Sequence, residues 1–202
     1  LDAIGAPECL VVGHNRGAPV ARNLAFTQPG RVRGAFIMDS VPDGFATPRR
    51  KDPTGRTWYF DFYRQRGVAE AIMKDNPQLF FSLFLDRNPH LSQEEHQFYV
   101  EAFSNPGTID AVLSDYRHGL EDDPAYWEQE ILNGRVIDVP IYVVWGAQGP
   151  SANVDMLESW RKVARDVDGE QIANAGHYIH EMNPGATANA INRFADRLNI
   201  AP

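Results

Sequence analysis

The sequence has little of several features that mark specialised classes of protein. Cys9 is the only cysteine among 202 residues, so no disulfide can form within the chain, and a reducing, cytoplasmic compartment is expected. No apolar run approaches the roughly 20 residues of a membrane-spanning helix. Basic residues are few, since 19 Lys and Arg stand against 27 Asp and Glu. The resulting net charge of −8 argues against nucleic acid or an anionic membrane as a partner.

Motifs that bind phosphate or metal are also lacking. Gly146 and Gly149 are not followed by the Lys and Ser/Thr of a phosphate-binding loop. His177 and His180 have a spacing that occurs in metal sites, but no cluster of Cys or carboxylates accompanies them. We therefore expect neither a metal nor another cofactor. There is no initiator Met, and residues 1–7 have the pattern of a helix that is ending, which predicts an N-terminally incomplete chain.

The remaining composition is that of a globular protein, with 43% hydrophobic and 23% charged residues. Residues 1–42 predict a strand at 9–13, a helix at 16–28 and a strand at 32–38. Short apolar strands joined by a helix are typical of parallel strands buried on both faces. Residues 134–202 return to this pattern, with strands expected at 140–145 and 169–173 and helices at about 153–166 and 186–197.

Residues 43–133 differ from both flanking segments because their patterns are helical. Aromatic and large apolar residues gather at 58–63 and 79–85. Ser92 and Glu95 form a capping-box pattern that predicts a helix running to about Ser104. Thr108 is expected to cap a further helix that Gly119 closes. The segment is therefore interpreted as an all-α insertion that forms a lid over the sheet edge.

The turn after the first strand is the most informative stretch of the chain. The apolar run that begins at Cys9 ends in Gly13-His14-Asn15-Arg16-Gly17 and passes directly into helical sequence. A strand, a tight turn with small flanking residues and a helix make the nucleophile elbow, which exposes its central side chain above a sheet. The central residue here is Asn15, whose carboxamide is a poor nucleophile. On its own the pattern is weak, since Asn and Gly favour ordinary turns.

Two further residues fall where strands end. Asp39 closes the second strand, and His177 follows the last one, so both are expected at the carboxyl edge beside Asn15. There His177 would act as a general base on water, and Asp39 would orient the imidazole. Each has a plainer interpretation, because Asp39 could make a turn hydrogen bond and His177 could lie on the surface. The order elbow, acid, histidine favours a catalytic set.

Several segments together resemble a known family. They are Val12–Ala18, Gln28–Val32, Met38–Pro42, Trp58–Phe60, Asp115–Arg117, Val144–Gly146 and Gly176–His177. They resemble the α/β-hydrolases that include epoxide hydrolases and haloacetate dehalogenases. The resemblance covers only the later part of a family member, because the early strands and the His-Gly-x-Pro loop, which supplies half of the oxyanion hole, have no counterpart.

The resemblance implies an α/β-hydrolase fold with a partial, mostly parallel sheet. Residues 1–42 would be core with the elbow, 43–133 an all-α cap inserted after the strand ending at Asp39, and 134–202 core with the histidine loop. Some relatives carry an acid after Trp145-Gly146, but Gln148 stands there, so the acid role falls to Asp39. A small molecule is the expected substrate, and a homodimer is a possible assembly.

The family also implies roles for individual residues. Its elbow residue is Asp, which attacks the substrate and forms an ester that His-activated water hydrolyses, and Asn15 stands in its place. Tyr59 and Tyr116 match the lid tyrosines that donate hydrogen bonds to an epoxide oxygen, and Arg16 and Trp58 are expected to contact substrate.

Haloacetate dehalogenases need two Arg in the elbow segment and a lid His. Arg16 matches the first Arg, but Pro19 replaces the second and Tyr59 replaces the His. The resemblance therefore favours epoxide opening, with the form carrying Asn15 inactive or impaired. A haloacetate dehalogenase, an inactive relative that binds a small hydrophobic ligand, and an esterase or lactonase using His177 and water directly remain alternatives.

Overall fold

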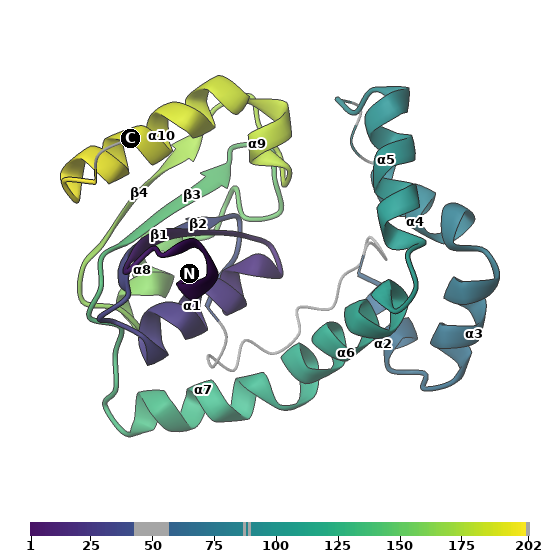
Figure 1. Ribbon diagram of the computed structural model, residues 1–202, viewed down its shortest axis with the longest axis horizontal. Helices are drawn as coiled ribbons and strands as arrows, with labels where there is room; N and C mark the ends of the chain where they lie inside the picture. Colours follow the sequence, from purple (N-terminus) through teal and green to yellow (C-terminus); the bar gives the residue numbers. More distant parts are fainter. Residues whose placement is uncertain (43–56, 87, 89, 201–202) are drawn as a thin grey trace. The chain divides into compact units, whose positions relative to one another are not determined.

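The computed structural model describes residues 1–42, 57–86, 88 and 90–200 (Figure 1). It divides into two compact units. The sheet unit comprises Leu1–Asp43 with Gln129–Pro202, and the helical unit comprises Gly44–Glu128. Residues near the start form a short 3-10 helix, η1 (Asp2–Ile4), that ends at Gly5 with a left-handed φ of 65°.

The sheet unit is built on four strands in the order β1-β2-β3-β4, and every neighbouring pair is parallel. The strands are β1 (Cys9–His14), β2 (Val32–Met38), β3 (Ile141–Gly146) and β4 (Val167–Ile172). The expected strands are all present. The last begins two residues earlier than its apolar residues suggested, because Val167 and Asp168 already pair with Ile141 and Tyr142.

Helices cover both faces of this sheet (Figure 1). On one face lie α1 (Gly17–Thr27) and α8 (Met156–Arg161), and on the other α9 (Ile179–Met182) and α10 (Pro184–Arg197). Gly34 permits the close approach of α10, since a Cβ there would lie 2.6 Å from Leu198 Cδ1. The core on the α10 side consists of Phe36, Met38, Val144, Ile172, Ala175, Ile179, Ala190, Phe194 and Leu198.

One helix of this unit is shorter than predicted. The pattern suggested a helix over about 153–166, but α8 begins at Met156, where Asp155 accepts a hydrogen bond from Glu158 N. A side chain that caps the first turn fixes the start of a helix, so the preceding residues remain outside it.

The helical unit contains α2 (Tyr59–Tyr63), α3 (Val68–Asp75), α4 (Pro77–Leu85), α5 (Gln93–Phe103) and α6 (Thr108–Glu121). A further helix, α7 (Asp123–Leu132), spans the boundary between the units. The helical unit has its own core, made of Tyr63, Ala69, Met73, Phe80, Phe81, Ile109 and Leu113.

The capping predictions had mixed outcomes. Ser92 caps α5 in a complete capping box with Glu95, as expected. Thr108 is wrong as a cap, because Gly107, with a left-handed φ of 83°, holds the N-cap position and Thr108 is the first helical residue. Gly119 does not close α6 either, since it is buried inside a helix that continues to Glu121. The roughly 1 kcal/mol that one internal Gly costs is offset by packing along the buried face of α6.

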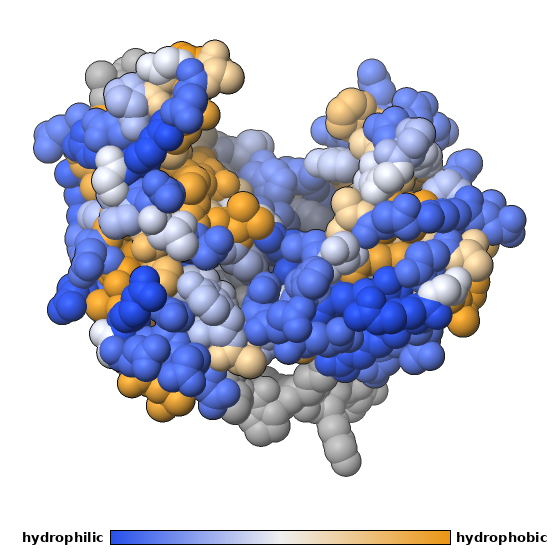
Figure 2. Space-filling model, turned by 60° about the horizontal axis from the view of Figure 1, so that its bottom comes forward, coloured by the Kyte–Doolittle hydropathy of each residue, from blue (hydrophilic) through white to orange (hydrophobic). Residues whose placement is uncertain are grey.

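The described helices include none that is both long and apolar enough to cross a membrane. Apolar side chains are visible on both units among larger hydrophilic areas (Figure 2). The most exposed apolar residues include Val20 in the sheet unit and Leu79 and Phe98 in the helical unit.

Candidate active site

The carboxyl ends of the parallel strands bring three predicted residues to one edge of the sheet. Asn15 directly follows β1, Asp39 directly follows β2, and His177 lies in the loop between β4 and α9. The register aligns the strand ends, since His14 pairs with Met38 and Met38 with Val144. Because ligands of open parallel sheets bind at this edge, the sheet itself places these side chains where chemistry is expected.

The turn at Asn15 has the geometry of an elbow. Asn15 has a left-handed φ of 50°, is half-buried, and donates its backbone N–H to Met38 O at 3.2 Å. Gly13 is required for the turn, because a Cβ there would lie 2.4 Å from Gly17 O. Gly17 is not needed for space among the described residues, since a Cβ there would meet nothing within 4 Å. Arg16 is the N-cap residue of α1 and is half-buried.

Asp39 and His177 are joined by a hydrogen bond between their side chains. His177 Nδ1 lies 2.5 Å from Asp39 Oδ2. A carboxylate only accepts, so Nδ1 carries the proton and donates it, which leaves Nε2 as the nitrogen able to take a proton from water. The Asp39 side chain is 0% exposed and that of His177 is 25% exposed. A buried carboxylate that orients a partly exposed imidazole is the arrangement of an activated general base.

Asp39 is held firmly at the end of β2. Its backbone N–H donates to Val144 O at 2.8 Å, and its φ of 46° is left-handed. The indole N–H of Trp160 donates to Ser40 O at 2.9 Å and fixes the residue that follows. Within the described part of the chain no donor reaches Asp39 Oδ1, so His177 is the group there that counters this buried charge. Nothing in the local sequence around Trp160 pointed to this role.

Close contact between Gly146 and Gly176 positions the loop that carries His177. A Cβ on Gly146, the last residue of β3, would lie 2.1 Å from Gly176 O and 2.5 Å from Ala175 O. The end of β3 therefore touches the backbone of the residue just before His177. Any side chain at position 146 would push the loop away from Asp39.

His14 belongs to the site although the sequence did not single it out. Its Nε2 lies 2.8 Å from His177 O, and its ring centroid lies 4.8 Å from those of His177 and His180. Burial, with the neighbouring His177 and His180, lowers the pKa of His14 to about 4 from its ordinary 6.5. The position of His14 beside Asn15 at the end of a strand was the only local sign of its role. The sequence could not show its hydrogen-bond partner, because His177 lies 163 residues further along the chain.

The helical unit carries the predicted tyrosines. The rings of Tyr59 and Tyr116 meet edge to face with centroids 6.0 Å apart. Buried Tyr63 lies beside both, with its ring 4.8 Å from that of Tyr116, and burial raises its pKa. Trp58 is 39% exposed and contacts Tyr59, Phe62, Phe80 and Phe84. Asn15, Asp39 and His177 belong to the sheet unit, whereas these aromatic residues belong to the helical unit.

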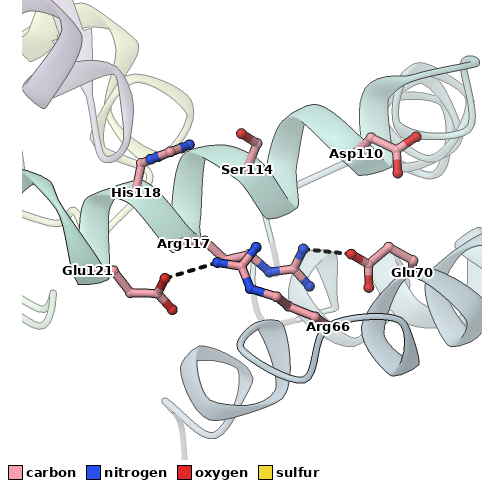
Figure 3. Close-up of a pocket in the computed structure, with 7 residues that line it drawn as sticks. All are labelled: Arg66, Glu70, Asp110, Ser114, Arg117, His118 and Glu121. Atoms are coloured by element: carbon pink, nitrogen blue, oxygen red, sulfur yellow. Dashed lines mark hydrogen bonds and ion pairs between the residues drawn. The ribbon is translucent and has the colours of Figure 1, made fainter.

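Arg117, next to Tyr116 on α6, joins three helices. Its Nε donates to Tyr63 O at 2.7 Å and its Nη1 to Glu70 Oε1 at 2.6 Å. This pair borders a cavity of about 240 Å³, where Arg66 also meets Glu121 (Figure 3). The charges around the cavity are matched by neighbours, so its lining favours no ligand of one sign. It is lined by Arg66, Glu70, Asp110, Ser114, Arg117, His118 and Glu121.

Groups of three or more His, Cys, Asp or Glu able to hold a metal are absent from the described residues. What the sheet edge offers is a turn that presents Asn15, a base nitrogen on His177 and a carboxylate that orients it. This set can activate water without a cofactor.

Comparisons with known proteins bear on the family and the fold of the chain. The family profile described as alpha/beta hydrolase fold matches residues 1–184. The soluble epoxide hydrolase of Corynebacterium sp. (strain C12) is 26% identical over 191 residues, which are 90% of this chain and 64% of that protein. Epoxide hydrolase A of Mycobacterium tuberculosis is 24% identical over 99% of this chain and 72% of its own length. The chain thus spans about two thirds of the length of these relatives.

Solved structures show the same fold. A putative alpha/beta hydrolase from Nostoc superposes with a TM-score of 0.85 at 28% identity, covering 96% of this chain and 68% of that one. A putative epoxide hydrolase from Pseudomonas aeruginosa superposes with a TM-score of 0.87 at 24% identity, covering 98% and 68%. The profile match, together with the parallel sheet, shows that the chain belongs to the α/β hydrolase fold family.

Proposed function

We propose that this chain belongs to a hydrolase that opens epoxides through an ester intermediate, and that Asn15 replaces the attacking carboxylate. The observation that carries the proposal is the 2.5 Å contact between His177 Nδ1 and Asp39 Oδ2 beside an elbow. A base held in this way can take a proton from a water molecule next to the residue at the elbow. The names of the epoxide hydrolase relatives support the choice of substrate class.

The reaction would proceed in two steps when the elbow carries Asp. The carboxylate attacks an epoxide carbon, the C–O bond of the ring breaks, and an ester forms while the new alkoxide takes a proton from Tyr59 or Tyr116, which would hydrogen-bond this oxygen. Arg16 and Trp58 would border the substrate. His177 Nε2 then takes a proton from water, and the hydroxide adds to the ester carbonyl. The intermediate collapses, the leaving alkoxide takes the proton from His177, and the proton of the restored carboxylic acid returns to the tyrosine as the diol is released.

The amide of Asn15 cannot perform the first step, because its nitrogen lone pair is delocalised and its oxygen carries no full charge. Loss of a nucleophile costs about 10⁴ to 10⁶ in rate in hydrolases where it has been tested by substitution. The form with Asn15 is therefore expected to bind an epoxide and to turn it over very slowly.

Asn15→Asp in the full-length protein is the direct test. We expect epoxide hydrolysis to rise by about 10⁴-fold or more, because the substitution restores a charged nucleophile without changing side-chain shape. The assay measures diol from epoxides and halide from haloacetates in parallel. Diol formation without halide release supports the proposal, and halide release from haloacetates would assign the dehalogenase alternative.

Three further variants and one surface control test the two steps of the mechanism. Asn15→Asp combined with His177→Gln should stop after the first step, so mass spectrometry should show the protein heavier by one substrate molecule. Tyr59→Phe and Tyr116→Phe in the Asn15→Asp protein should each slow ring opening, while Phe98→Leu, a change on the exposed surface of α5, should not.

Two results would overturn the proposal. If Asn15→Asp hydrolyses neither epoxides nor haloacetates, the elbow is no nucleophile position and a ligand-binding relative is indicated. If the protein with Asn15 intact by mass hydrolyses esters or lactones, His177 acts on water directly. The mass measurement is needed because deamidation of Asn15 would by itself create the Asp form.

A further inference from the structure

His14 connects the elbow to the histidine loop. It is the last residue of β1, directly before Asn15, and its Nε2 lies 2.8 Å from the backbone oxygen of His177. His177 is therefore held at two points, one on its ring and one on its main chain. Asp39 holds the imidazole of His177 through Nδ1, and His14 holds the main chain of the same residue.

The acceptor fixes the tautomer of His14. A carbonyl oxygen can only accept, so Nε2 of His14 carries a proton and donates it. In the neutral ring Nδ1 is then unprotonated. The tautomer of His14 is thus set by its hydrogen bond to His177, the residue whose ring would accept a proton during the reaction.

The surroundings of His14 keep it uncharged. Burial lowers its pKa to about 4, and the neighbouring His177 and His180 act in the same direction, while the hydrogen bond to His177 O and the charge of Asp39 oppose them. Nε2 of His180 itself lies 3.8 Å from Oε1 of Glu181. An uncharged His14 places no positive charge next to His177 when that ring takes up a proton.

We propose that His14 is a positioning residue for the base. As a neutral ring that donates from Nε2, it holds the carbonyl of His177 at the elbow and so keeps the imidazole against Asp39. This inference rests on the proposed function for its catalytic consequence, but its structural part concerns the protein whether or not it turns over epoxides.

The structural part is tested by NMR on the unaltered protein. Nitrogen-15 shifts of the imidazoles should show His14 protonated at Nε2, unprotonated at Nδ1 and unchanged from pH 8 to about pH 5, as a pKa near 4 requires. The Nδ1 proton of His177 should give a strongly downfield signal because its hydrogen bond is short. A His14 protonated at Nδ1, or one that titrates above pH 6, would overturn the proposal.

Variants of His14 test the coupling. His14→Leu removes the donor, whereas the amide of Gln in His14→Gln still donates and stays uncharged. We expect His14→Leu to broaden or abolish the downfield His177 signal and His14→Gln to retain it. His180→Gln is the matched control, because His180 also contacts the His14 ring but has no bond to His177 O among the described residues.

The catalytic part uses the same variants in the Asn15→Asp protein. His14→Leu should lower kcat about tenfold, the size of one lost hydrogen bond, with KM within about twofold, and His14→Gln should restore most of it. If His14→Leu keeps both the downfield signal and kcat, the proposal is wrong. If it loses the signal while the Asn15→Asp parent shows no turnover, His14 positions His177 as stated and the proposed function alone fails.

Discussion

The backbone at Asn15 explains why an amide can occupy the elbow without disturbing the fold. Asn15, Asp39, Asn174 and Asn199 are the described non-glycine residues with positive φ, and all are Asn or Asp. These two residue types tolerate the left-handed region better than most, because their short polar side chains bond locally. The Asn15→Asp change should therefore alter chemistry and leave stability nearly the same. A failure of that variant to react could not be attributed to a strained turn.

At the same scale, His14 should make the fold sensitive to mild acid. Its pKa is about 4 in the folded protein and near 6.5 when unfolded, so the unfolded chain binds the extra proton first. The free energy of unfolding is therefore unaffected by His14 above pH 6.5. As the pH falls toward 4, protonation of His14 in the unfolded chain lowers this free energy by at most about 3 kcal/mol. Urea unfolding at pH 7 and pH 4.5 should show a smaller loss for His14→Gln than for the unaltered protein. Equal losses in the two proteins would contradict this assignment.

At the scale of elements, α2, α3 and α6 depend on Arg117. Its bonds to Tyr63 O and Glu70 join the helices that carry Tyr59 and Tyr116. The side chain of Arg117 is 9% exposed and that of Glu70 is 25% exposed, so the pair is largely shielded from water. The spacing of Tyr59 and Tyr116 therefore depends on helices that the bonds of Arg117 hold together.

Glu70→Gln should loosen this part of the helical unit by about 1 to 3 kcal/mol, because a charged hydrogen-bond partner of Arg117 is lost. The bond to Arg117 lowers the pKa of Glu70 to about 2 from 4.5. The stabilisation is therefore present above pH 4.5 and is lost as the pH falls toward 2. Asp110→Asn is the control, since the Lys74–Asp110 pair is 51% and 55% exposed and should contribute less than about 1 kcal/mol. Denaturant unfolding at pH 7 and pH 3 measures both.

The elements that the sequence predicted well are those with strong local signals. β1 and β2 follow from short apolar runs, and α5 from its Ser92–Glu95 box. The structure shortens α8 relative to its apolar pattern because Asp155 caps its first turn, and it extends α6 past Gly119 to Glu121 because a glycine inside a packed helix need not end it. At the site, Asp39 and His177 could be found because strand ends are recognisable. His14 and Trp160 could not, since their bonds join residues 163 and 120 positions apart.

At the scale of the whole molecule, the two units have separate cores. Phe194 is buried in the core of the sheet unit and Phe81 in that of the helical unit. No residue belongs to both of these clusters. A cavity in one core should therefore be felt mainly within its own unit.

Phe194→Ala should destabilise the sheet unit by about 3 to 5 kcal/mol. Hydrogen exchange should then speed up in β2, β3 and α10 and remain nearly unchanged in α3, α4 and α6. Phe81→Ala is the reciprocal variant and should have the opposite pattern. Equal acceleration in both units by either variant would show that they unfold as one.

The position of β1 at the end of the strand order has a practical consequence for handling the protein. The side of β1 away from β2 carries main-chain N–H and C=O groups that no other described strand pairs, and Val12 is 44% exposed. The outer side of a terminal strand is a template on which a further strand can add. When the protein is concentrated, its solubility should depend on whether the outer side of β1 is covered. Turbidity during purification would show that this side is exposed, before any activity is assayed.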